Sequence, residues 1–139
     1  MKKVAIVYWS GTGNTEAMAK SVEEGVKAAG GNPEVIWCEQ FNSSRLDSYD
    51  SIAFGCPAMG DEQLEEGSFE PMFSELEDKL AGKTVGLFGS YEWNDGEWMR
   101  RWKDRVSGKC NLACEPVTAY GAPDEETKKM CIDLGKRLS

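Results

Sequence analysis

The sequence predicts an α/β fold, a parallel sheet with helices on both faces. Strand-like apolar runs alternate with helix-like segments along the chain, which is typical of repeated strand–helix–strand units. The first run, Val4–Tyr8, lacks polar alternation, as a strand buried on both faces does. A length of 139 residues fits one domain, so we expect residues 1–139 to form a single unit.

The first half of the chain contains one clear helix. In Asn14–Ala29, the residues Met18, Val22 and Val26 recur every four positions, and Gly30-Gly31 predicts the end of the helix. Residues 39–50 are polar and predict a loop. Short apolar runs predict three more strands, the first of them weakly and near an edge: Pro33–Trp37, Ser51–Cys56 and Thr84–Ser90.

Two further helices follow from apolar stripes. Ser68–Leu80 places five apolar residues on one side, and Pro71 is tolerated because it falls in the first turn. Glu97–Val106 places Trp98 and Trp102 four residues apart, so both are assigned to the core. The charged residues of this helix are interpreted as its solvent side: Arg100, Arg101, Lys103 and Arg105.

The chain then returns to the sheet and ends in a helix. Cys110–Tyr120 predicts a fifth strand, interrupted near Pro116. Asp124 is a suitable N-cap for a last helix that continues to Leu138.

Composition excludes several kinds of chemistry. The chain has no histidine and none of its five cysteines forms a CxxC pair, so a His-based catalytic triad or a zinc site is not expected. A net charge of −8 argues against nucleic acid as a partner. Neither a membrane span nor a signal peptide is predicted, and we expect a cytoplasmic protein with free thiols. Any redox activity would therefore need an organic cofactor.

Three loops of unusual composition follow strand ends: residues 10–15, 57–67 and 90–96. The carboxyl ends of parallel strands meet at one edge of the sheet, so one ligand could contact all three loops. The first, Ser10-Gly11-Thr12-Gly13-Asn14-Thr15, opens a helix with small residues and hydroxyls but no cation. It could be only a tight strand–helix connection. It also suits a terminal phosphate held by neutral donors, whereas a P-loop would need a lysine.

The other two loops carry side chains suited to a flat ring. Met59 and Gly60 lie at the tip of the second loop, where a thioether can pack on a π system and the backbone can turn at low cost. Trp93 lies among polar residues of the third loop, away from the stripe of the next helix, which favours a stacking role. Trp9 and Trp37 are interpreted as packing residues.

The chain resembles the flavodoxins, because its phosphate loop, its methionine–glycine loop and its tryptophan loop follow one another in the order found in that family. The resemblance covers essentially the whole chain. Ser10–Thr15 matches the family pattern Ser/Thr-x-Thr-Gly-Asn-Thr in full. Met59-Gly60-Asp61-Glu62 and Ser90-Tyr91-x-Trp93 are similar to the loops of short-chain, clostridial-type members. The resemblance implies a flavodoxin-like three-layer sandwich with a five-stranded parallel sheet of order 2-1-3-4-5.

The cofactor implied by the resemblance is non-covalent FMN. Residues 10–15 and Ser90 would hold its phosphate, while Met59 and Trp93 would cover the two faces of its ring. The Gly60 carbonyl would face flavin N5, and Glu62 would bind the edge near N3. The expected cofactor-binding set is Ser10, Gly11, Thr12, Gly13, Asn14, Thr15, Pro57, Ala58, Met59, Gly60, Asp61, Glu62, Ser90, Tyr91, Glu92, Trp93 and Asn94, with no catalytic residue and no metal ligand.

The function implied is transfer of single electrons at low potential, with the FMN passing between semiquinone and hydroquinone. A second negative charge close to a phosphate and several carboxylates should be unfavourable. Residues 61–78 contain eight carboxylates and no base, which indicates either a solvated face or a surface that attracts basic redox proteins in transient complexes. We expect a monomer.

The residues alone leave three alternatives to an electron carrier open. The same fold could belong to a small flavin-dependent reductase, although Met59 and Trp93 leave little room for a substrate over the ring. It could belong to a flavodoxin specialised for activating the metal site of a ribonucleotide reductase. A receiver-type signalling domain is the third, but it would need an acceptor aspartate at the strand ends, where this chain has serine, threonine, cysteine and tryptophan.

Overall fold

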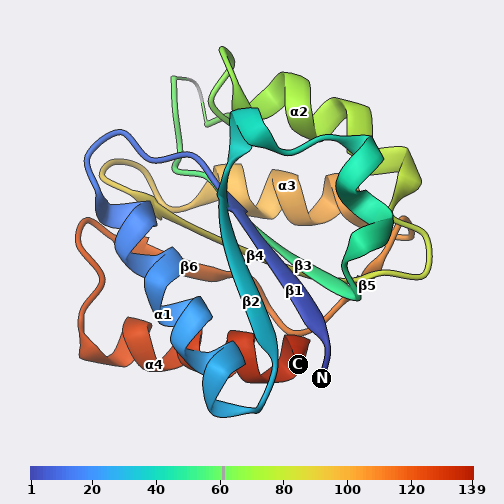
Figure 1. The fold of residues 1–139 in the computed structure, drawn as a ribbon. Coiled ribbons are helices and arrows are strands. Elements are labelled where there is room, and N and C mark those ends of the chain that lie inside the picture. The colour runs from blue at the N-terminus through green and yellow to red at the C-terminus, as the bar shows by residue number, and fades with distance from the viewer. Residues whose placement is uncertain (61) are drawn as a thin grey trace.

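The computed structural model describes residues 1–60 and 62–139, and its central feature is a parallel sheet (Figure 1). The strands run in the order β2-β1-β3-β4-β5, and β6 also pairs with β4. This confirms the predicted order, with the last strand in two pieces. The six strands are β1 (Lys3–Tyr8), β2 (Asn32–Trp37), β3 (Ser51–Gly55), β4 (Thr84–Tyr91), β5 (Asn111–Leu112) and β6 (Val117–Tyr120).

Helices cover both faces of the sheet, as predicted. On one face, α1 (Asn14–Ala28) packs against α4 (Glu125–Leu138). On the other face lie α2 (Phe69–Leu76) and α3 (Glu97–Val106) (Figure 1). Each pair closes its own apolar core against the strands. The apolar stripes that predicted the helices are the surfaces that these cores bury.

The ends of α1 and α4 follow the predicted capping chemistry. Gly30 has a φ of 87° and, with Gly31, closes α1 through hydrogen bonds to Lys27 O (3.0 Å) and Val26 O (2.9 Å), the pattern of a Schellman motif. The carboxylate of Asp124 accepts a hydrogen bond of 2.8 Å from the backbone N–H of Thr127 at the start of α4.

The prediction of a plain loop at residues 39–50 is wrong. Two short 3-10 helices, Cys38–Gln40 and Ser43–Ser48, lie in this part of the chain. Phe41, Leu46 and Tyr49 are buried in the core on the α2 and α3 face. These apolar residues have no helical or strand period, so their burial becomes evident only once the sheet edge and α2 are in place.

The last strand is interrupted where proline predicted it. β5 pairs with Thr84 and Val85 at one end of β4, and β6 pairs with Phe88–Tyr91 at the other end. Residues 113–116 leave the sheet between the two pieces. They stand opposite only two residues of β4, so the chain makes a bulge-like excursion at the sheet edge.

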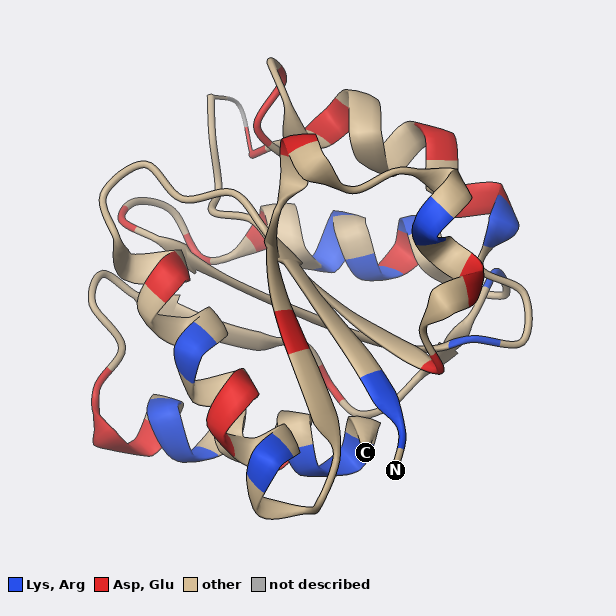
Figure 2. Ribbon diagram, viewed as in Figure 1, with Lys and Arg blue, Asp and Glu red and all other residues tan. Residues whose placement is uncertain are grey.

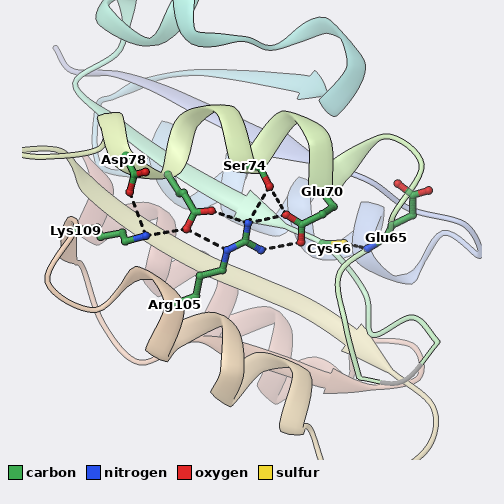
Figure 3. A network of polar contacts seen from close by, with 8 residues as sticks. Cys56, Glu65, Glu70, Ser74, Asp78, Arg105 and Lys109 are labelled. Carbon is green, nitrogen blue, oxygen red and sulfur yellow. Dashed lines mark hydrogen bonds and ion pairs between the residues drawn. The ribbon is translucent and has the colours of Figure 1, made fainter.

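The interpretation of the basic residues of α3 as a solvent face is wrong for Arg105. Its guanidinium makes two bonds to Glu70 (2.7 and 2.6 Å) and two to Glu77 (3.1 and 2.8 Å), which joins α3 to α2 (Figure 3). Lys109 binds Glu77 at 2.9 Å and Asp78 at 3.1 Å. Part of the acidic run 61–78 is therefore used inside the fold, where it holds the two helices together.

Charge is distributed unevenly over the molecule (Figure 2). Lysine and arginine lie mainly on the helices, while the loops at the carboxyl ends of the strands carry carboxylates. In the described part of the chain, no helix has both the length and the apolar character that crossing a bilayer requires.

Candidate functional site

The three predicted loops meet at the carboxyl ends of β1, β3 and β4, around a cavity of about 160 Å³. Eleven of the predicted residues line this cavity. The full lining is Trp9, Ser10, Gly11, Thr12, Thr15, Pro57, Ala58, Met59, Ser90, Tyr91, Glu92 and Trp93. Gly13, Asn14, Gly60, Glu62 and Asn94 lie outside the lining, and Asp61 lies outside the described residues.

The first loop is shaped by one serine and one glycine. The Ser10 hydroxyl accepts hydrogen bonds from the backbone N–H groups of Gly13 (3.1 Å) and Glu16 (3.2 Å). Gly13 has a φ of 98°, a conformation that favours glycine, and precedes the first turn of α1. Among the described contacts, the N–H groups of Thr12, Asn14 and Thr15 have no protein acceptor. Donors of this kind at a helix N-terminus suit an anion.

Ser90, at the end of β4, connects the three loops. Its hydroxyl lies 3.0 Å from that of Thr15, and both side chains are buried. Its carbonyl accepts a hydrogen bond of 3.0 Å from the backbone N–H of Ala58. The sheet therefore fixes the relative position of all three loops, and the site is built on rigid strand ends.

The second loop closes on itself at its tip. Met59 and Gln63 exchange two backbone hydrogen bonds, of 2.9 and 3.0 Å, which form an isolated bridge. Gly60 has a φ of 52° and Glu62 a φ of 56° on the two sides of position 61. A positive φ is unusual for a glutamate, so contacts around Glu62 must hold this conformation.

Trp98 supplies one of those contacts. Its backbone N–H donates to Glu62 Oε2 at 2.7 Å, so this carboxylate caps the N-terminal turn of α3, and its indole N–H donates to Cys56 O at 3.1 Å. Arg101 also donates to the Glu62 carbonyl, at 3.4 Å. Glu62 is 7% exposed, and its other oxygen, Oε1, is buried without a partner among the described atoms. A buried carboxylate oxygen requires a donor, which a bound ligand can supply.

The far end of the second loop is fixed by Glu65. Its carboxylate accepts three hydrogen bonds of 2.8 Å from the backbone N–H groups of Gly67, Ser68 and Phe69 at the start of α2. Its own backbone N–H donates to the thiol of Cys56 at 3.3 Å (Figure 3). Met59 and Gly60, at the tip of the loop, take no part in these contacts of Glu65.

The third loop carries aromatic residues in different environments. Trp93 is 48% exposed at the mouth of the cavity, as its polar neighbours predicted. Tyr91 lines the cavity and packs against Trp98, with ring centroids 5.4 Å apart. Trp98 and Trp102 are buried, which confirms their assignment to the core. Asn94 has a φ of 66° and faces solvent in the turn before α3.

Trp9 is the cavity residue that sequence reasoning missed. It was interpreted as a packing residue, and it does contact Trp37, with ring centroids 6.2 Å apart. It also lines the cavity beside Gly11, where a Cβ atom would lie 3.0 Å from the Trp9 ring. Its position directly after β1, next to the phosphate-type loop, was the available signal.

The cavity contains no cation. The charged residue of its lining is Glu92, and none of the lining residues is a lysine or arginine. In the described part of the chain, no group of three His, Cys, Asp or Glu residues could hold a metal ion. Burial raises the pKa of Cys56 at the end of β3, so this thiol stays protonated and inert. The site is thus suited to binding a phosphate and a flat ring through neutral groups.

Comparison with known protein sequences finds relatives of one family. The flavodoxin family model matches residues 6–135. The chain is 58% identical to the flavodoxin of Megasphaera elsdenii over 96% of both proteins, and 44% identical to that of Clostridium beijerinckii over 96% of this chain and 97% of the relative.

Solved structures give the same result. The solution structure of two-electron reduced Megasphaera elsdenii flavodoxin superposes with a TM-score of 0.88 over 97% of both chains, with 47% identity when residues are matched by structure. The crystal structure of oxidised flavodoxin 2 from Bacillus cereus has a TM-score of 0.85 at 29% identity, covering 98% of this chain and 97% of that one.

Proposed function

The chain belongs to the flavodoxin family, and from this premise we propose how its three loops hold FMN and carry electrons. As a flavodoxin it is an FMN-binding electron-transfer protein that serves redox partner proteins, and it is a carrier rather than an enzyme. Bound FMN supplies the ability to accept and donate electrons one at a time.

Residues 10–15 bind the phosphate. The N–H groups of Thr12, Asn14 and Thr15 lack protein acceptors, which is the single observation that carries this assignment. Ser10 is occupied in holding the loop, because its hydroxyl accepts from Gly13 and Glu16. The paired hydroxyls of Thr15 and Ser90 add donors on the β4 side. No lysine is needed, since oriented N–H groups and the dipole of α1 favour an anion.

Met59 and Trp93 enclose the ring from the two loop tips. Both side chains line the cavity from different loops, and Trp93 is 48% exposed. Glu62, in the same loop as Met59 but outside the cavity lining, has a buried and unpartnered Oε1 that could accept a hydrogen bond from the N–H of a ring edge. Gly60 has a φ of 52°, and glycine lets the backbone at this loop tip change conformation at low cost, so that its carbonyl can turn toward the ring.

The surroundings favour a low second potential. Glu92 lines the cavity, the lining holds no cation, and Glu62 is buried in the same loop as the lining residue Met59. Added negative charge in this partly dry site is penalised by the phosphate and the carboxylates. We therefore propose that the second electron enters at a lower potential than the first, and that the working couple is the lower one.

The carrier meets its partners as a monomer in transient complexes. Among the described residues only Met1, Trp93, Tyr120 and Met130 are large exposed hydrophobics, too few and too scattered for a permanent interface. The carboxylates at the loop end favour partners with basic docking surfaces. Five free thiols fit a reducing compartment such as the cytoplasm.

Titration of the apoprotein with FMN tests the proposal, with flavin fluorescence as the signal, followed by stepwise reduction. We expect one FMN per chain and two resolved one-electron steps. Failure to bind FMN would contradict the site. A single two-electron step, or consumption of NADPH by the protein alone, would instead favour the flavin-dependent reductase.

A further inference from the structure

Tyr120 is an aromatic residue on the surface beside the cavity. It ends the edge strand β6 and is 68% exposed, which is high for a large apolar ring. In the sheet register it stands opposite Tyr91, the cavity residue that ends β4. The two rings meet edge to face with centroids 5.2 Å apart. Tyr120 therefore contacts a residue of the cavity lining and faces solvent.

The rings beneath Tyr120 are firmly held. Tyr91 rests on Trp98 with centroids 5.4 Å apart, and Trp98 is 1% exposed. Trp98 is in turn fixed at both of its donors, to Cys56 O and to the Glu62 carboxylate. The series Trp98, Tyr91, Tyr120 forms a rigid aromatic ledge that reaches from the core to the surface. A preordered ring loses little conformational entropy when a partner covers it.

Carboxylates are frequent in the segments that carry this ledge. Residues 84–99 and 110–127 contain seven of them and no lysine or arginine, and four of the seven pair with cations of α3 and α4: Asp95, Glu97, Glu115 and Glu125. Among the described residues, Glu92, Asp124 and Glu126 carry negative charge without an ion-pair partner. Glu92, Glu115 and the run 124–126 are exposed. The cations of the neighbouring α3 surface are paired: Arg100 with Asp95 at 3.0 Å, and Lys103 with Glu115 at 2.5 Å.

We propose that the outer end of this ledge, Tyr120 with Tyr91 beneath it, is the apolar contact point for redox partner proteins whose own apolar patch is ringed by lysine and arginine. The inference rests on the proposed function, because it places the partner on the β4–β6 side of the same cofactor site. Tyrosine at the centre of a contact is a frequent source of binding energy, and a charged rim adds steering. Tyr91 lies between cavity and partner, so docking here keeps the electron's path short.

A purely structural role for Tyr120 makes a different prediction. Aromatic residues favour strands, and a ring pair between β4 and β6 would stabilise the sheet edge. In that case replacement of Tyr120 would lower the unfolding temperature and leave partner binding unchanged. Tyr120→Thr separates the two roles, since threonine is also a good strand residue but has no ring. Tyr120→Phe keeps the ring, and Met130→Gln removes an exposed apolar residue from α4 as a matched control.

The test uses the FMN-loaded protein and a basic c-type cytochrome, a probe whose exposed haem edge is ringed by lysines. Calorimetric titration with both proteins oxidised measures binding without electron transfer. Stopped-flow mixing then measures the step in which one electron leaves the reduced protein and converts haem iron(III) to iron(II). Hexacyanoferrate(III), a small anion that needs no docking surface, serves as the second oxidant.

We expect Tyr120→Thr to weaken cytochrome binding and slow its reduction by about tenfold at low ionic strength. Tyr120→Phe and Met130→Gln should stay within about twofold of the parent. The rate with hexacyanoferrate(III) should not change. Equal cytochrome binding and rates in Tyr120→Thr and the parent would overturn the proposal. If the parent itself reduced neither oxidant, the proposed function would fail instead.

Discussion

Replacement of Arg105 by methionine tests how the two helices behind the cofactor loops are held. The guanidinium binds Glu70 and Glu77 in forked pairs, touches the Ser74 hydroxyl at 3.1 Å and lies 5.1 Å from the centre of the Phe73 ring (Figure 3). Methionine preserves the helix and most of the apolar stem while removing the charge. Among the described residues, Glu70 then has no ion-pair partner and Glu77 keeps Lys109, at 2.9 Å.

The magnitude follows from burial. The side chains of Arg105, Glu70 and Glu77 are 27%, 34% and 15% exposed, between a surface pair and a buried one. Surface ion pairs contribute about 1 kcal/mol or less, whereas breaking a buried pair costs about 3–5 kcal/mol. We therefore expect Arg105→Met to lower the free energy of unfolding by about 2–3 kcal/mol at pH 7.

The effect depends on pH in a defined direction. Hydrogen bonds from Arg105 hold the pKa values of Glu70 and Glu77 below the usual range of a glutamate. A lowered pKa in the folded state stabilises the protein above the unfolded pKa, and this stability is lost as the pH falls through the folded value. The difference between parent and variant should therefore be constant at neutral pH and shrink in acid, below about pH 4.

Urea unfolding of the apoprotein from pH 3 to pH 7, followed by circular dichroism, measures this difference. Lys103→Met is the matched control, because Lys103 lies on the same helix and pairs with the 80% exposed Glu115, so it should equal the parent within error. The reasoning would be refuted by an Arg105→Met variant as stable as the control, or by a stability loss that stays the same in acid.

Three further substitutions have expected outcomes. Gly89→Ala should destabilise the protein by about 3 kcal/mol or more in urea unfolding, since the new Cβ would lie 2.1 Å from Cys56 O; near-parent stability would contradict this close approach. Thr15→Val should weaken FMN binding by about tenfold in fluorescence titration, because Ser90 loses its hydroxyl partner; unchanged affinity would remove this pair from the phosphate site. Glu62→Ala should lower the stability of the apoprotein by about 1 kcal/mol and should also weaken FMN binding. If only the stability fell, Glu62 would act as a cap of α3 and not as an FMN ligand.

Periodic signals predicted the secondary structure well. The helix Glu97–Val106 was predicted to the residue, because Trp98 and Trp102 mark its buried side and glycines bound it. The predicted helix Ser68–Leu80 proved shorter: α2 ends at Leu76 and a 3-10 turn, Glu77–Lys79, continues it. The meeting of the three loops at one cavity was predictable too, since short loops at parallel strand ends are brought together by topology alone.

What the sequence could not predict depends on partners far along the chain. The cap that Glu62 provides to α3 joins residues 36 positions apart, and the bond of Arg105 to Glu70 spans 35. Neither pair has a local pattern, and both look like ordinary surface charge until the helices are packed. The burial of Phe41 and Leu46 has the same origin, because tertiary packing alone decides it.

The excursion at residues 113–116 has a practical consequence for engineering. The sheet pairings before and after it, at β5 and β6, are set independently, so extra residues here need not shift either register. Closing a longer loop costs only about 0.6 kcal/mol for each doubling of its length. Residues 113–116 are thus a suitable insertion site for a tag, a reporter or a tether to an electrode, because the loops of the cofactor site lie on other segments and stay intact.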